Sequence, residues 1–216
     1  MENNNRYRII DIEKYYRKTQ YLRFKDGPKC SITMTYSLDI TKAYNFAKNR
    51  NEKINIVLLY LVSQAINSRD DYKLFYDYKK DELRCYEVSN PIHYIFNKET
   101  ETCKPVYSYY NPDYEIFYKT IIEDTKKAEK DDYVGKENEP NFFNTSAMPW
   151  ISYDSFSLEL PDGYLYLNPN INWGKFHKEG DRILLPITIR MNHAGADGYL
   201  LSKFFLILEE LIEKLK

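Results

Sequence analysis

The residues most suited to chemistry lie between an apolar run and a helical segment near the end of the chain. There His193 begins the sequence His-Ala-Gly-Ala-Asp-Gly, with Asp197 four positions later. A neutral imidazole accepts a proton near pH 7, so a histidine held rigidly at the mouth of a core can act as a general base. The small residues 194–196 leave room for a substrate beside it. The pattern predicts a catalytic turn, although an ordinary turn with Asp197 as a helix N-cap would have the same sequence.

Asp197 has a further candidate role. It cannot easily reach the imidazole of His193 across a tight turn, so we expect it to brace the loop by pairing with a cation. The other histidines, His93 and His177, lie in no comparable pattern and are interpreted as structural or solvent-exposed.

The elements on either side of this turn follow from their hydrophobic patterns. Residues 182–191 form a continuous β-favouring run typical of a central strand. Residues 199–216 place apolar side chains on one broad face of a helix. Together they predict a strand, the turn and a helix in succession.

The rest of the chain mixes strands and helices. Helices are predicted from Thr41 onward and over 55–67 and 113–128, and strands over 30–40, 81–88, 92–96 and 150–158, with Ser146 at the start of the last strand. A polar stretch over 126–140 indicates a surface loop, and Pro161-Asp162-Gly163 indicates a turn. Because βαβ alternation is not strict, we expect an α+β fold with a large mixed sheet, in a single domain over residues 1–216.

Composition limits the classes of partner. The chain has 31 Lys+Arg against 32 Asp+Glu and a formal net charge of -1, so no field of one sign draws it to nucleic acid or to an anionic membrane. It has no signal-peptide pattern and no apolar run of the ~20 residues that span a bilayer, which predicts a cytoplasmic protein. Its three widely spaced cysteines suggest neither a disulfide framework nor a metal site.

Short motifs along the chain resemble those of the chloramphenicol acetyltransferases, in the same order and at nearly the same intervals. The motifs are Asp11-Ile12, Arg17-Lys18, Leu38-Asp39-Ile40-Thr41, Glu99-Thr100-Glu101-Thr102, Ser146-Ala147-Met148-Pro149-Trp150, Gly174-Lys175-Phe176 and the His193 turn. The turn is shared with the wider superfamily of CoA-dependent acyltransferases, including dihydrolipoyl acyltransferase cores. The Glu-Thr-Glu-Thr and Ser-x-x-Pro-Trp elements, and the absence of a lipoyl domain, indicate the smaller family.

This resemblance implies a two-layer α/β sandwich, acetyl-CoA as co-substrate, and a homotrimer with each site between two subunits. It implies that His193 takes the proton from an acceptor hydroxyl and that Ser146 donates to the oxyanion of the tetrahedral intermediate. Arg17 and Asp197 match a buried ion pair that shapes the loop. From the residues alone, Ser146 is also consistent with an ordinary strand-start serine and Arg17 with a surface arginine on a first helix. The apolar C-terminal strand and helix also favour an oligomer.

The resemblance further implies the residues of the two binding pockets. Positions that contact coenzyme A match Lys53, Trp150 and Phe176. Positions of the acceptor pocket match Phe24, Cys30, Cys103, Leu158 and Asn172.

Some positions depart from the family pattern. Asn192 and Leu200 replace histidines, Cys103 replaces a phenylalanine of the antibiotic pocket, and Asn172-Trp173 replaces a Thr-Met pair. We expect these departures to cluster in the acceptor pocket. There Cys103 in place of phenylalanine removes a large apolar contact, and Trp173 would add one. Chloramphenicol is the first acceptor expected, and the alternatives are another hydroxylated compound or a catalytically weak trimer that binds CoA or a ligand. A binding protein needs no base, so the intact catalytic positions favour an enzyme.

Overall fold

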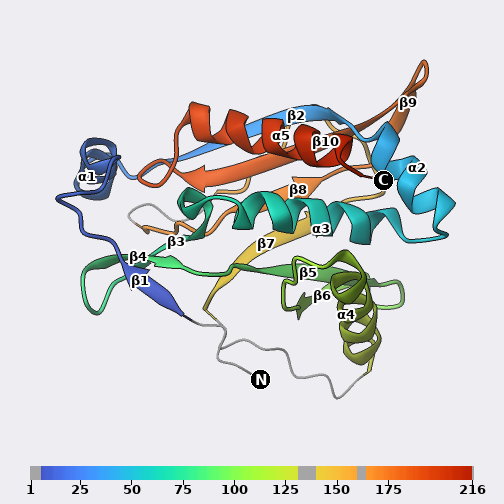
Figure 1. Cartoon of the computed structure of the whole chain (residues 1–216), viewed down its shortest axis with the longest axis horizontal. Coiled ribbons are helices and arrows are strands. Elements are labelled where there is room, and N and C mark those ends of the chain that lie inside the picture. The colour runs from blue at the N-terminus through green and yellow to red at the C-terminus, as the bar shows by residue number, and fades with distance from the viewer. Residues whose placement is uncertain (1–5, 131–139, 160–163, 216) are drawn as a thin grey trace.

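The computed structural model describes residues 6–130, 140–159 and 164–215 (Figure 1). Its helices are α1 (Lys18–Asp26), α2 (Thr41–Asn49), α3 (Ile54–Asn67), α4 (Tyr114–Ala128) and α5 (Gly198–Glu213), with a 3-10 turn η1 (Asp70–Lys73). Its strands are β1 (Tyr7–Ile9), β2 (Ser31–Asp39), β3 (Leu74–Asp77), β4 (Glu82–Tyr86), β5 (Asn90–Asn97), β6 (Thr102–Tyr107), β7 (Phe142–Ala147), β8 (Asn170–Trp173), β9 (His177–Glu179) and β10 (Arg182–Asn192).

The large sheet is mixed, which confirms the predicted fold class. Its strand order is β2-β10-β8-β7-β5-β6, and β9 also pairs with β10. Strand β7 runs parallel to both β8 and β5, whereas β10 is antiparallel to β2 and β8, and β5 is antiparallel to β6. A separate small sheet has the order β1-β4-β3. The strand that leads to the His193 turn therefore lies inside the large sheet, between β2 and β8.

Helices α2, α3, α4 and α5 form a second layer on one face of the large sheet (Figure 1). Helix α3 is buried on nearly every side, from Ile56 to Ile66, because it lies between the sheet and the neighbouring helices. An α-helix that is apolar all round is stable in water only in such a position. Ile187 and Ile189 of β10 face this layer and belong to its core. The apolar C-terminal strand and helix are therefore covered within one chain, so their apolarity does not itself require a partner.

No described helix covers the other face of the large sheet, and where β10, β8 and β7 pair, this face is polar. Thr188 and Arg190 of β10 alternate with the core residues, and their side chains therefore point to this opposite face. A coil segment after β7 lies over it, since the Tyr153 hydroxyl donates to the carbonyl of Asn172 (2.9 Å) and accepts from the Thr188 hydroxyl (3.3 Å). Polar side chains here are thus buried by coil and by each other, and one face of the sheet is available for chemistry.

The predicted strand over 150–158 is wrong, and the described structure has coil there. Strand β7 already has β5 and β8 on its two sides, so the chain that follows it crosses the polar face instead of extending the sheet. Ser146 accordingly lies near the end of β7 and not at the start of a strand. The other predicted strands and helices are confirmed within a few residues. The predicted turn at 161–163 and most of the loop over 126–140 lie outside the described residues.

A smaller apolar cluster holds α1 beside the His193 turn. Tyr21 of α1 is fully buried against Leu83 of β4, Leu167 and Ala194 of the turn. Helix α1 thus depends on the small sheet for its position, although it contributes to the surroundings of His193. None of the described helices is both long and apolar enough to cross a membrane.

Candidate active site

The turn between β10 and α5 is organised by Asn192. Its side-chain oxygen accepts a hydrogen bond from the N–H of Ala194 (2.9 Å), and its backbone carbonyl accepts from Gly195 and Ala196 (3.0 and 3.1 Å). An asparagine side chain that bonds to the backbone two residues later is a common way to fix a turn. Asn192 is buried, so this departure from the family pattern shapes the turn itself.

The imidazole of His193 is held in one orientation and one tautomer. Its Nδ1 lies 2.8 Å from the carbonyl oxygen of Ala196, and its ring stacks on Phe24 with centroids 3.9 Å apart. Because a carbonyl oxygen only accepts, Nδ1 must carry the hydrogen, and Nε2 then has a free lone pair. The backbone N–H of His193 donates to the carbonyl of Cys30 (3.0 Å), which ties the turn to the start of β2. The site therefore presents Nε2 as a proton acceptor.

Gln20 of α1 fastens the same turn from the side. Its Nε2 donates to the carbonyls of His193 and Ala196, both at 3.0 Å, and its Oε1 accepts from Arg17 at 2.6 Å. Both amide hydrogens are thereby used, so Gln20 does not compete for Nδ1, which it approaches only to 3.5 Å. Gln20 belongs to none of the motifs described above. Its spacing of three residues from Arg17, which puts both on one face of a helix, was the available signal.

The ion pair between Arg17 and Asp197 forms, with Nη2 and Oδ2 at 2.8 Å. The Arg17 side chain is 10% exposed and that of Asp197 33% exposed. Burial alone would raise the pKa of Asp197, but the Arg17 guanidinium and the N–H of Leu200 outweigh it and hold that pKa below its usual range. Asp197 is also the N-cap of α5, because its side chain accepts from Leu200 N–H at 3.1 Å. Asp197 thus both pairs with Arg17 and caps α5.

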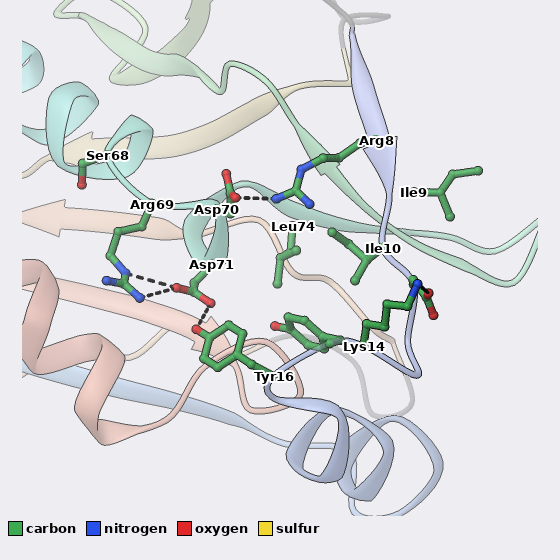
Figure 2. A pocket seen from close by; sticks show the side chains of 12 residues that line it. Arg8, Ile9, Ile10, Lys14, Tyr16, Ser68, Arg69, Asp70, Asp71 and Leu74 are labelled. Atoms are coloured by element: carbon green, nitrogen blue, oxygen red, sulfur yellow. Dashed lines mark hydrogen bonds and ion pairs between the residues drawn. The ribbon is translucent and has the colours of Figure 1, made fainter.

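The residues just before Arg17 line a charged pocket, which is drawn in Figure 2. There Asp71 accepts hydrogen bonds from Arg69 (2.7 Å) and from the Tyr16 hydroxyl. Tyr16 lines both this pocket and the one around His193. The guanidinium of Arg17 lies 5.9 Å from the centre of the Tyr16 ring. The acidic and basic groups of Figure 2 therefore neutralise one another and fix the approach to α1.

Seven of the predicted site residues line one of two pockets of the same chain: Arg17, Phe24 and His193 the first, and Cys103, Ser146, Leu158 and Asn172 the second. The first, of about 650 Å³, is lined by His193 and residues of α1 and its approach, including Arg17, Gln20 and Phe24. The second, of about 570 Å³, lies on the polar face of the sheet and is lined by residues that include Cys103, Ser146, Leu158 and Asn172. Among the described residues that line them, the two pockets have none in common. Cys30 belongs with the first through its bond to His193.

Two of the departures lie elsewhere than expected. Trp173 and Leu200 are buried in the core on the helical side of the sheet, so neither faces the second pocket. Trp173 alternates with Asn172 along β8, and adjacent strand residues point to opposite faces. The expectation that Trp173 adds apolar surface to the acceptor pocket is therefore wrong, and Cys103 and Asn172 are the departures that change it.

The three positions expected to contact coenzyme A lie on different elements. Lys53 is exposed at the N-cap of α3, and Trp150 is exposed beyond β7 with its ring edge-on to Phe96. Phe176 packs on Tyr44 of α2. The chains next to Trp150 and Phe176 meet, because Lys175 N–H donates to the carbonyl of Ile151 at 2.8 Å. In the parts of the chain described, no three His, Cys, Asp or Glu side chains gather as a metal ion would require.

Known proteins of similar sequence carry the name of one family, and the similar structures include others. A sequence model of the family "Chloramphenicol acetyltransferase" matches residues 5–209. A chloramphenicol acetyltransferase of Clostridium butyricum is 31% identical over 207 residues, which cover 95% of this chain and 94% of the relative. A solved chloramphenicol acetyltransferase superposes with a TM-score of 0.86 at 23% identity, covering 98% of this chain and 100% of that one. The truncated catalytic core of the 2-oxoacid dehydrogenase multienzyme complex from Thermoplasma acidophilum gives 0.68 at 13% identity, covering 93% and 92%.

The two roles of Asp197 can be separated by substitution. Asp197→Asn keeps an N-cap side chain but removes the charge opposite Arg17, and should cost about 1–3 kcal/mol of stability, between surface and buried ion pairs. Asp197→Ala should cost about 1 kcal/mol more, since the cap is lost too. Denaturant unfolding at pH 7 tests this order, and an Asn variant as stable as the wild type would contradict it. Because the folded-state pKa of Asp197 is lowered, the charge effect should be complete well above pH ~3.9 and vanish as pH falls below that lowered pKa.

Proposed function

The chain belongs to the chloramphenicol acetyltransferase family, and from that membership we propose that it transfers the acetyl group of acetyl-CoA to a hydroxyl group of a small molecule. Chloramphenicol is the first acceptor to test. The free cysteines of this chain, two of them exposed, fit a reducing compartment, and we propose that the protein is located in the cytoplasm. The observation that carries the proposal is the hydrogen bond from Nδ1 of His193 to the carbonyl of Ala196.

In the proposed reaction, Nε2 of His193 accepts the proton of the acceptor hydroxyl as that oxygen attacks the acetyl carbonyl carbon. Negative charge then develops on the carbonyl oxygen, where the hydroxyl of Ser146 would donate a hydrogen bond. A hydrogen-bond donor at this position stabilises the transition state by about 3–4 kcal/mol. When the tetrahedral intermediate breaks down, the carbon–sulfur bond is cleaved and the imidazolium returns the proton to the thiolate of CoA. A catalytically silent binding protein would have no need of the tautomer that Ala196 imposes.

We further propose that the working enzyme is a homotrimer whose sites lie between subunits. In one chain the pocket with His193 and the pocket with Ser146 share no lining residue, which supports a site that combines the His193 pocket of one copy with the Ser146 pocket of its neighbour. Large exposed apolar side chains on or beside the second pocket support a contact there: Tyr94, Phe96, Trp150, Ile151, Leu158 and Tyr164. We propose that Lys53, Trp150 and Phe176 hold coenzyme A, and that Phe24 and Cys30 border the acceptor from the side of His193.

Removal of the base tests the mechanism directly. His193→Ala should fold normally, and its kcat should fall about 10²- to 10⁴-fold, because the group that takes the proton from the substrate hydroxyl is removed. The matched control is His177→Ala, which removes an exposed histidine on β9 and should keep wild-type turnover. Thiol release from acetyl-CoA in the presence of acceptor measures both. A folded His193→Ala protein with near-wild-type kcat would refute the assignment.

Assembly is tested by mass. Light scattering should give three times the chain mass of 26.0 kDa. A monomer that turns over acceptor at a rate independent of protein concentration would exclude a site shared between subunits.

The acceptor pocket is tested at Cys103. Since Cys103 stands where the family has phenylalanine, wild-type enzyme should bind chloramphenicol weakly, and Cys103→Phe should lower its KM about 10- to 100-fold by restoring apolar contact. Trp173 lies on the other side of the sheet and cannot obstruct the new ring. Steady-state kinetics at saturating acetyl-CoA give the result, with the KM for acetyl-CoA as the internal control. A low wild-type KM that rises on substitution would show that the pocket already suits chloramphenicol.

A further inference from the structure

One side of helix α1 is directed at the turn that carries His193. Arg17 is the N-cap of α1, and Gln20 and Phe24 follow it at spacings of three and four residues, which places the three on one side of the helix. All three line the pocket of His193. Phe24 stacks on the imidazole, whereas Gln20 contacts the backbone that orients it. The next residue, Tyr21, is fully buried in the cluster that holds α1 beside the turn, so the point from which Gln20 reaches the turn is fixed.

The side-chain amide of Gln20 is held in one orientation by Arg17. Nη2 of Arg17 carries two hydrogens, and it donates to Oδ2 of Asp197 (2.8 Å) and to Oε1 of Gln20 (2.6 Å). Because a guanidinium only donates, the amide oxygen must face Arg17, and Nε2 then faces the turn. Among the hydrogen bonds of the described residues, none joins the guanidinium of Arg17 to the imidazole of His193. The Arg17 side chain is therefore connected to the base through Gln20.

Both hydrogens of the Gln20 amide go to the turn. Nε2 lies 3.0 Å from the carbonyl oxygen of His193 and 3.0 Å from that of Ala196. The Ala196 oxygen also accepts the Nδ1 hydrogen of His193 at 2.8 Å, so both of its lone pairs are used. With no hydrogen left over, Gln20 cannot donate to a bound acceptor, although it lines the pocket. These contacts indicate a role in the placement of the two carbonyls and not in the binding of substrate.

We propose that Gln20 is a positioning residue for the base. By fixing the carbonyl of Ala196, it keeps the hydrogen of His193 on Nδ1 and leaves the lone pair on Nε2. A displaced carbonyl would release the ring to its other tautomer and to other orientations, and a small misplacement of a reacting group is costly in rate. This inference rests on the proposed acetyl transfer, in which Nε2 of His193 accepts the proton, and adds a residue to the groups that prepare that step.

Two substitutions separate hydrogen-bond donation from side-chain volume and from the bond to Arg17. Gln20→Glu keeps the shape of the side chain and an oxygen that accepts from Arg17, but when ionised it has no hydrogen for the turn. Gln20→Met keeps a similar volume and removes both kinds of bond. The matched control is Gln64→Met on α3, because Gln64 is also a partly exposed helical glutamine and is not among the described residues that line either pocket.

Turnover and tautomer are measured separately. Thiol release from acetyl-CoA, with chloramphenicol as the acceptor, gives kcat and the KM for acetyl-CoA. The tautomer of His193 is given by 15N–1H correlation NMR of histidine-labelled protein at about pH 8.5, where imidazoles are neutral. His193→Ala identifies the His193 signals among those of three histidines, and the exposed His177 is the internal reference. The melting temperature of each variant reports any loss of stability.

Wild type should show His193 as a single tautomer with its hydrogen on Nδ1. Gln20→Glu and Gln20→Met should both move the His193 signals toward the averaged signals of His177. Both should also lower kcat about 10- to 100-fold with the KM for acetyl-CoA unchanged. Gln64→Met should match wild type in tautomer and in kcat.

Either an unchanged tautomer or an unchanged kcat in the two Gln20 variants would refute the proposal and make Gln20 structural, even if their melting temperatures fall. If wild type itself releases no thiol with chloramphenicol, the proposed function fails for this acceptor, and the NMR measurement alone decides the role of Gln20. A tautomer that changes in the Gln20 variants and not in Gln64→Met then supports positioning, and an unchanged tautomer refutes it.

Discussion

The carbonyl oxygen of Ala196 accepts the Nδ1 hydrogen of His193, and most of the neighbouring structure keeps that carbonyl in place. Asn192 closes the turn from one end and Asp197 from the other, where it also caps α5. Gln20 holds the carbonyl from the side of α1. A free histidine exchanges its tautomers readily, so a defined base requires a defined acceptor, and here the acceptor is backbone. The rigidity of this one carbonyl is what turns an ordinary strand–turn–helix junction into a candidate catalytic group.

The large sheet divides its two faces between different tasks. Along β10, Ile187 and Ile189 face the helical layer, while Thr188 and Arg190 point to the opposite side of the sheet. The apolar face secures the strand thermodynamically, because burial of such side chains contributes about 1.5–3 kcal/mol each. That stability allows the opposite face to carry buried polar groups, of which Asn170 and Asn172 leave a side-chain nitrogen without a partner among the described residues. The same alternation decides which departures from the family bear on the acceptor, since Asn172 and Trp173 are adjacent in sequence but separated by the sheet.

Strong local patterns were predicted well from the sequence. The apolar run of β10, the broad apolar face of α5 and the His193 turn between them each have a distinct signature over several residues. The failures share a physical cause, which is that a local pattern does not say what lies opposite. Residues 150–158 alternate like a strand, but both edges of β7 are already occupied. Trp173 in a four-residue strand has no pattern long enough to assign its face. Gln20 acts through backbone carbonyls far away in the chain, which no sequence pattern near it encodes.

The bonds from Gln20 to the turn join residues 173 and 176 positions apart. During synthesis the two backbone carbonyls that Gln20 binds are therefore made only when almost the whole chain exists. The same delay applies to the sheet, because β2 lies beside β10 and has no other neighbour among the described strands. Closing so long a loop is entropically costly and slow, and topologies rich in distant contacts fold slowly. Nascent chains consequently lack the strand partner of β2 for most of translation, and the catalytic turn becomes ordered among the last parts of the molecule.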